Sequence, residues 1–230
     1  MLIYFLIAFS SISQSKAFAD QDQEIKSIIS LNKSGIQKCD ADIKIYEALQ
    51  ERALNGVVSS RAEKPIVIQP KGFPVLYKTE EIKRKDIETR DAKISEFKKQ
   101  RQDILDGKFL APYIFGDSRT KVHGLSRVKN EKAILVKPLE TGRSIVQINV
   151  DFSGSDGNYF VVLQSDHFFE KRGQVIPCEG IFEFIGFSEV ELTKDDASGQ
   201  KVKVGKQNFP EITLADEAME KIRMGIGLKK

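Results

Sequence analysis

The residues best placed to act as an acid–base pair are Asp166 and His167, which are adjacent in the sequence. A carboxylate and an imidazole can activate the hydroxyl or thiol of a distant Ser or Cys, which makes a hydrolase one alternative function. Adjacent strand residues, however, point to opposite faces, and the local sequence is typical of a strand end. The only other histidine is His123, and serine-elbow and phosphate-loop motifs are absent. We therefore assign no catalytic residue and leave the hydrolase as an alternative.

Oxygen-bearing side chains alternate between Asp151 and Gly157, as in a calcium-binding loop. An EF-hand needs glycine at the sixth position and a bidentate glutamate at the twelfth, where this chain has Asp156 and Val162. A hairpin turn explains the same cluster of turn-forming residues. The sequence thus predicts no metal site, and we expect no cofactor.

The only two cysteines are Cys39 and Cys178. An intrachain disulfide would close a loop of about 139 residues, worth on the order of 5 kcal/mol. Two reduced buried thiols, or an intermolecular bridge through Cys39, are the alternatives. A catalytic cysteine is disfavoured, because nothing around Cys178 resembles an activating environment.

The chain begins with about a dozen apolar residues, too few to cross a bilayer, which takes roughly 20. Ala17 and Ala19 then stand where a signal peptidase reads small residues, and a strongly polar stretch follows from Asp20. Residues 1–19 are therefore predicted to be a cleaved signal peptide. We expect an exported protein, periplasmic or extracellular, with no transmembrane segment in the mature chain.

The charge is nearly balanced, with 36 basic and 33 acidic residues and a net charge of +3. Residues 109–230 hold 17 basic and 17 acidic side chains, although eight aromatic residues lie between Phe152 and Phe187. Stacking of bases on aromatic rings needs a positively charged groove as well. We therefore expect these rings to fill a core and predict no nucleic-acid partner.

Residues 20–108 are expected to be mainly helical. A stripe at helical spacing predicts one helix over 20–54, formed by Ile25, Ile29, Ile36, Cys39, Ile43, Tyr46 and Ala53. Three prolines make 55–78 an extended connector. Thr79 is a suitable N-cap for a second helix ending at Gly107, supported by three acid–base pairs at i,i+4 that begin at Glu80, Glu81 and Asp86. The two helices could form a hairpin, or the first could form a coiled coil with another copy or another protein.

From residue 109 to residue 214, apolar residues tend to recur at every second position, which is typical of strands. Alternation from Val146 to Phe152, a turn-rich stretch and a second strand from Tyr159 predict a β-hairpin. Gly186 predicts a bulge or a sharp bend in a strand over 181–192. The remaining predicted strands cover 133–136, 174–176 and 201–204, and a short helix and tail occupy 215–230.

Together these features predict an α+β fold: long N-terminal helices followed by a small antiparallel β-barrel or sandwich. The leading functional hypothesis is an exported, non-enzymatic protein whose helical arm and β domain engage another protein or the cell envelope. Alternatives are the hydrolase using Asp166 and His167, and a carrier of an apolar ligand inside the β domain.

Overall fold

The computed structural model describes residues 3–60, 62–70, 72–114, 124–139, 142–148, 159–166, 169, 171–195 and 201–228. The chain divides into two compact units. Residues 32–106 form the first, which we call the helical hairpin; residues 1–31 and 107–230 form the second, which we call the β domain. The longest helix, α1 (Ile3–Leu54), contributes to both units. The helices precede an extensive sheet, so the fold class is α+β, as predicted.

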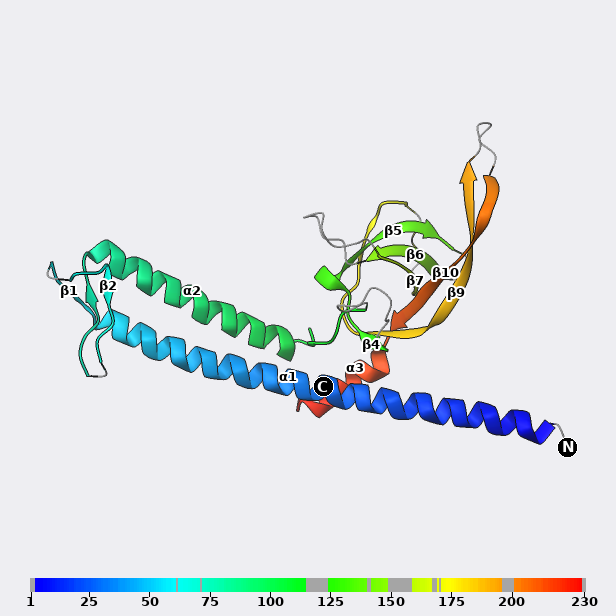
Figure 1. The fold of residues 1–230 in the computed structure, drawn as a ribbon, viewed down its shortest axis with the longest axis horizontal. Coiled ribbons are helices and arrows are strands. Elements are labelled where there is room, and N and C mark those ends of the chain that lie inside the picture. The colour runs from blue at the N-terminus through cyan, green and yellow to red at the C-terminus, as the bar shows by residue number, and fades with distance from the viewer. Residues whose placement is uncertain are drawn as a thin grey trace. The chain divides into compact units, whose positions relative to one another are not determined.

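Within the helical hairpin, α2 (Glu80–Leu105) packs against the second half of α1 (Figure 1). The Tyr46 and Phe97 rings lie 5.6 Å apart, and Arg101 Nε lies 2.7 Å from Asp40 Oδ1. Cys39, on the predicted apolar stripe, is buried. The middle of this stripe, at Tyr46, therefore contacts α2 of the same chain, which is the hairpin alternative; a coiled coil with another chain stays a prediction.

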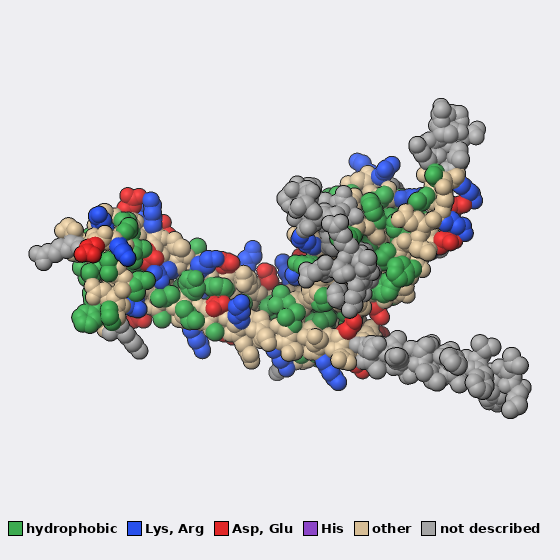
Figure 2. Space-filling model, in the orientation of Figure 1, with side chains coloured by type: hydrophobic (Ala, Val, Ile, Leu, Met, Phe, Trp, Pro, Cys, Tyr) green, Lys and Arg blue, Asp and Glu red, His purple; other side chains and the backbone are tan. Residues whose placement is uncertain are grey.

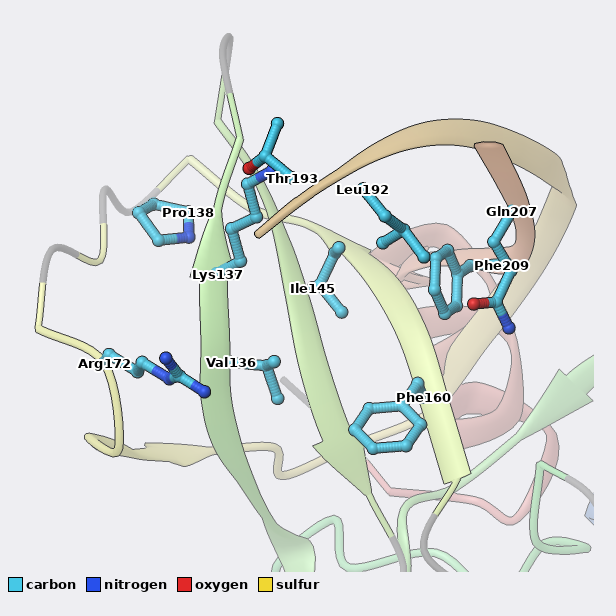
Figure 3. Close-up of a pocket in the computed structure, with 10 residues that line it drawn as sticks. All are labelled: Val136, Lys137, Pro138, Ile145, Phe160, Arg172, Leu192, Thr193, Gln207 and Phe209. Atoms are coloured by element: carbon cyan, nitrogen blue, oxygen red, sulfur yellow. The ribbon is translucent and has the colours of Figure 1, made fainter. Parts of the chain in front are cut away.

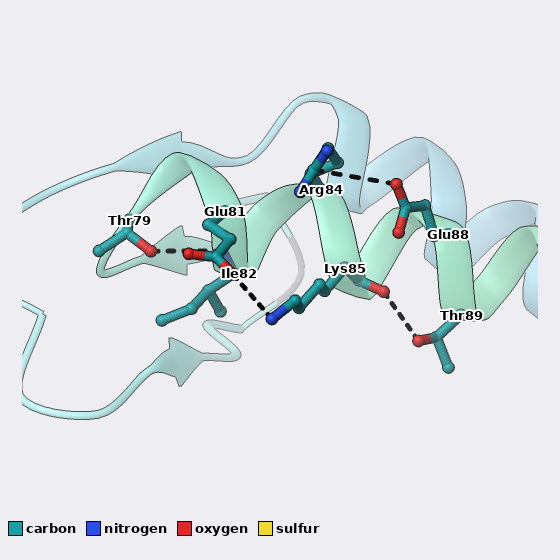
Figure 4. Close-up of polar contacts among 7 residues, drawn as sticks. All are labelled: Thr79, Glu81, Ile82, Arg84, Lys85, Glu88 and Thr89. Atoms are coloured by element: carbon teal, nitrogen blue, oxygen red, sulfur yellow. Dashed lines mark hydrogen bonds and ion pairs between the residues drawn. The ribbon is translucent and has the colours of Figure 1, made fainter.

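The start of α2 follows the predicted capping chemistry (Figure 4). Thr79 Oγ1 accepts a hydrogen bond from the Ile82 N–H at 3.3 Å, which satisfies a backbone donor that has no partner within the helix. The pairs Glu81–Lys85 and Asp86–Arg90 form at 2.7 and 2.9 Å, as predicted. Arg84 differs from the prediction, because it pairs with Glu88 at 3.8 Å rather than with Glu80.

The connector folds into three short strands at the end of the hairpin. They are β1 (Val57–Val58), β2 (Ile66–Val67) and β3 (Leu76–Tyr77), in the order β1-β3-β2. Tyr77 is fully buried, and its hydroxyl donates to Asp86 Oδ2 at 2.6 Å. A Cβ at Gly56 would lie 2.4 Å from the Tyr77 ring, so only glycine fits there. The extended connector is confirmed, and Tyr77 ties it to α2.

The described residues of the β domain form one seven-stranded sheet that curls into a half-barrel (Figure 1). The strand order is β4-β9-β10-β7-β6-β5-β8. The strands are β4 (Leu125–Ser126), β5 (Lys132–Pro138), β6 (Arg143–Ile148), β7 (Tyr159–Gln164), β8 (Val175–Pro177), β9 (Phe182–Asp195) and β10 (Lys201–Leu214), with a 3₁₀ turn at Lys129–Glu131 before β5.

The predicted purely antiparallel sheet is wrong in one pairing. β10 lies beside β7 in parallel, while every other described pair in this sheet is antiparallel. β8 and β9 both run opposite to β7, so β10, which is antiparallel to β9, lies parallel to β7. The terminal strands of the order, β4 and β8, are not paired with each other among the described residues, and the sheet stays an open half-barrel.

Two local strand predictions are confirmed. β6 and β7 pair as an antiparallel hairpin with Ile148 opposite Tyr159, and their connection lies outside the described residues. The register of β9 and β10 shifts where Glu211 pairs with Gly186 and Ile212 pairs with Phe184. Gly186 has φ +142°, a conformation that side chains disfavour. The glycine thus marks a bulge, after which β9 and β10 continue as a two-stranded ribbon.

The sheet is apolar on both faces. Successive strand residues point to opposite sides, so Val146 and Val161 enter one core while Ile145 and Val162 enter another. The larger core also contains Cys178, Leu135 and Ile176, and the smaller one contains Val190 and Phe209 from the ribbon. The predicted half-buried β6 is therefore buried on both faces between residues 144 and 146, because side chains of the ribbon cover the second face.

The beginning of α1 belongs to the β domain through a third core. Ile25 and Ile28 are buried with Leu125 of β4 and with Ile222 of α3 (Asp216–Gly225), the predicted C-terminal helix. Glu24 Oε2 also accepts a hydrogen bond from the Leu125 N–H at 2.8 Å. Residues that follow the predicted cleavage site therefore anchor α1 to the sheet.

Candidate functional site

A groove of about 550 Å³ lies on the second face of the sheet of the β domain (Figure 3). Its floor is the smaller core, where Ile145 and Phe209 are nearly inaccessible. The side chains of Phe160, Val136 and Leu192 are partly exposed and form the walls above this floor. The remaining lining residues are Lys137, Pro138, Arg172, Thr193 and Gln207.

Strand alternation and the ribbon build this groove. Ile145 of β6 and Phe160 of β7 project from the same face of neighbouring strands. Leu192 and Phe209 come from β9 and β10, whose ribbon passes over that face (Figure 3). Arg172 comes from the segment between β7 and β8. Side chains far apart in the sequence thus converge on one apolar surface.

The polar groups of the groove are basic or neutral. Lys137 and Arg172 lie toward one side in Figure 3, and Phe160 and Phe209 lie toward the other. None of the ten described lining residues is acidic. Lys137 Nζ donates to the backbone oxygen of Glu191 at 3.3 Å, while the Glu191 carboxylate pairs with Lys203 at 2.7 Å. The groove therefore joins an apolar floor to a positively charged margin.

A polar cluster lies on the same sheet face, outside the groove lining. Arg143 Nε lies 2.9 Å from Glu211 Oε1, and the Ser188 hydroxyl donates to Glu211 Oε2. Arg143 also donates to Ser188 Oγ at 2.5 Å. The cluster ties β6 to β9 and β10.

The sequence-predicted acid–base pair is only partly placed. Asp166 is exposed, two residues beyond the end of β7, and does not line the groove. His167, His123 and the Asp151–Gly157 segment lie outside the described residues. Among the described residues, no three metal-binding side chains gather at one point. The described part of the chain thus offers no assembled catalytic or metal centre.

Both cysteines are free and buried, Cys39 in the helical hairpin and Cys178 in the larger core of the β domain. Burial raises the pKa of the Cys178 thiol to about 12. The pKa of the Cys39 thiol is also raised, first by burial and then by the nearby carboxylates of Asp42 and Asp40. Both are therefore weak nucleophiles at neutral pH. The disulfide between them stays a prediction.

Comparisons with protein-family models, with curated proteins and with solved structures find no match for this chain. A function must therefore be inferred from the geometry of the site alone.

The N-terminal predictions concern a segment whose backbone is helical. Ala17 and Ala19 lie within α1, and cleavage after Ala19 stays a prediction. In the described part of the chain, no helix combines the length and the apolar character that crossing a bilayer requires.

No sequence motif marks the groove residues. Val136, Lys137 and Arg172 belong to strand and loop segments with no motif, and Phe209 lies beyond the predicted end of its strand. One signal was present: Ile145 and Val162 place apolar side chains on the face of β6 and β7 that a half-buried sheet would leave polar. That pattern indicates a sheet covered on both sides.

Proposed function

We propose that this chain is an exported, non-enzymatic binding protein whose β domain holds an apolar ligand in the groove. The observation that carries the proposal is the groove of about 550 Å³ with Ile145, Phe160, Leu192 and Phe209 along it. Small-molecule sites typically have volumes of about 300–1,000 Å³, with mainly apolar walls and a few polar groups. The groove has a volume in this range, and six of its ten described lining residues are apolar. It takes the place of the barrel interior that the sequence predicted for such a ligand.

The first experiment measures binding of an uncharged fluorescent probe, N-phenyl-1-naphthylamine, and its displacement by dodecanol. Phe160→Ser removes a groove wall, and its matched control is Phe187→Ser, a more exposed ring outside the groove lining. Phe160→Ser removes apolar contact worth about 1 kcal/mol of binding free energy. Its affinity for N-phenyl-1-naphthylamine and for dodecanol should therefore be about fivefold lower than that of the unmodified protein. Equal affinities in the two variants, or no probe binding by the unmodified protein, would contradict the proposal.

Export is the second part of the proposal, and it rests on residues 1–19. The described contacts of α1 with the β domain begin with Asp22, which lies 3.6 Å from Lys221 Nζ, and continue with Glu24, Ile25 and Ile28. Cleavage after Ala19 would leave these contacts in place. Amino-terminal sequencing of protein from its native cell should begin at Asp20; an intact Met1 would refute export by cleavage.

We further propose that the helical hairpin engages a protein with an acidic surface. Four apolar side chains, Leu54, Val57, Ile68 and Phe73, are about half or more exposed at the end of the hairpin, where Figure 2 shows hydrophobic groups gathered. The connector over 55–78 contains four basic residues and one acidic residue. An apolar patch on a segment with net positive charge favours an acidic partner.

A photo-crosslinking residue in place of Phe73 tests this contact in the native cell. The control is the same substitution at Lys44, an exposed position midway along the hairpin. An acidic protein should be captured from position 73 alone, with a yield that falls as salt rises. Capture of a second copy of this chain would instead indicate self-association, and equal capture from both positions would contradict a contact specific to the hairpin end.

A further inference from the structure

We infer that the ligand of the groove is an anionic amphiphile, a single alkyl chain that ends in a carboxylate or phosphate group. The inference rests on the proposed function, because it names the ligand class of the same groove. Two cations, Lys137 and Arg172, lie toward one side of the groove, and the Phe160 and Phe209 rings lie toward the other (Figure 3). An uncharged apolar ligand would form no charge-assisted hydrogen bond with these two cations.

The charged side is suited to an anionic head group. The hydrogen bond from Lys137 Nζ to the Glu191 backbone oxygen holds the ammonium between β5 and β9 and uses one of its three donors. Arg172 adds a guanidinium with five donors, and Thr193 adds a hydroxyl. Charge-assisted hydrogen bonds of this kind are the stronger ones in proteins. No carboxylate among the ten described lining residues competes with the ligand for these donors.

The apolar side sets the length of the chain. A methylene group is close in size to a water molecule, which takes about 30 Å³, so the groove has room for at most about 18 such groups. The groove is open to solvent, which makes shorter chains the better fit. Each methylene that the groove buries should strengthen binding about fourfold.

The test compares four competitors that displace N-phenyl-1-naphthylamine at pH 8 below their micellar concentrations: dodecanoate, dodecyl phosphate, dodecanol and dodecylammonium. Because the cations are partly solvated, we expect dodecanoate to bind about tenfold more tightly than dodecanol, with dodecylammonium the weakest. The preference between dodecanoate and dodecyl phosphate distinguishes a free fatty acid from a phosphate-bearing lipid as the source of the head group.

The variants separate charge from apolar contact. Lys137→Gln with Arg172→Gln should remove the tenfold preference for dodecanoate over dodecanol, and a urea midpoint equal to that of the unmodified protein shows that the β domain remains folded. Lys171→Gln, the exposed neighbour of Arg172 that does not line the groove, should behave as the unmodified protein.

Three results would overturn the inference. If dodecanol binds as tightly as dodecanoate, the head-group assignment fails while the proposed function stands. If none of the four displaces the probe, the proposed function fails as well. Tighter binding of an end-blocked apolar peptide than of dodecanoate would indicate a protein strand as the natural occupant.

Discussion

Replacing Ile28 with alanine should destabilise the β domain strongly, although this residue lies in a helix far from the sheet in sequence. Ile28 is 4% exposed and packs in the core that contains Ile25, Phe109, Leu125 and Ile222. Truncation of a buried isoleucine to alanine typically costs about 2–5 kcal/mol, through lost burial and the cavity left behind. We expect about 3 kcal/mol, because the site lies among helix and strand side chains that cannot all move to fill the space.

Leu31→Ala provides the matched control, because Leu31 lies one turn further along α1 and is 46% exposed. The free energy of unfolding should fall by no more than about 0.5 kcal/mol in Leu31→Ala, as for most surface substitutions. With a urea dependence of about 2 kcal/mol per molar, the midpoint of unfolding should fall by about 1.5 M for Ile28→Ala and hardly at all for Leu31→Ala. Circular dichroism in urea measures both. Equal midpoints would refute the anchoring of α1 to the β domain.

Three further predictions concern buried groups. Gly56→Ala should cost about 1–3 kcal/mol in urea unfolding, since the added Cβ would lie 2.4 Å from the Tyr77 ring; a stability equal to wild type would contradict this packing. Tyr77→Phe should cost about 1–2 kcal/mol by the same assay, because it removes the hydrogen bond to Asp86, and no loss would show that this bond is unimportant. Burial raises the pKa of Cys178 from 9.0 to about 12, so the thiol ionises first in the unfolded chain. The contribution of the protonated Cys178 thiol to the free energy of unfolding is complete below pH 9 and declines by about 1.4 kcal/mol per pH unit from pH 9 to 12. The urea midpoint should therefore change little from pH 8 to 9 and fall from pH 9 to 10, with a smaller fall in Cys178→Ala.

Local chemistry made several elements predictable from the sequence. Thr79 begins α2 because its hydroxyl accepts a backbone hydrogen bond, and Gly186 marks the bulge because its φ is +142°. The prolines of the connector prevent a helix there, and the alternation through Val146 indicates a strand. Each of these signals depends on residues a few positions apart.

Long-range pairing accounts for what the sequence did not indicate. The parallel contact of β7 with β10 joins segments separated by two other strands, and no local pattern encodes it. Asn32, a polar residue in the helix predicted over 20–54, is fully buried. The groove needs Val136, Arg172 and Phe209 together, and only the folded sheet brings them to one surface.

The most direct test of the groove is an isotope-filtered nuclear Overhauser experiment on methyl-labelled protein with unlabelled dodecanoate. We predict contacts from the alkyl chain to the methyl groups of Ile145, Leu192 and Val136, which line the groove. Ile176 and Ile222, buried in the two other cores of the β domain, should show none. Contacts confined to Ile176 or Ile222, or a chain that contacts no methyl group, would contradict a ligand site on this face of the sheet.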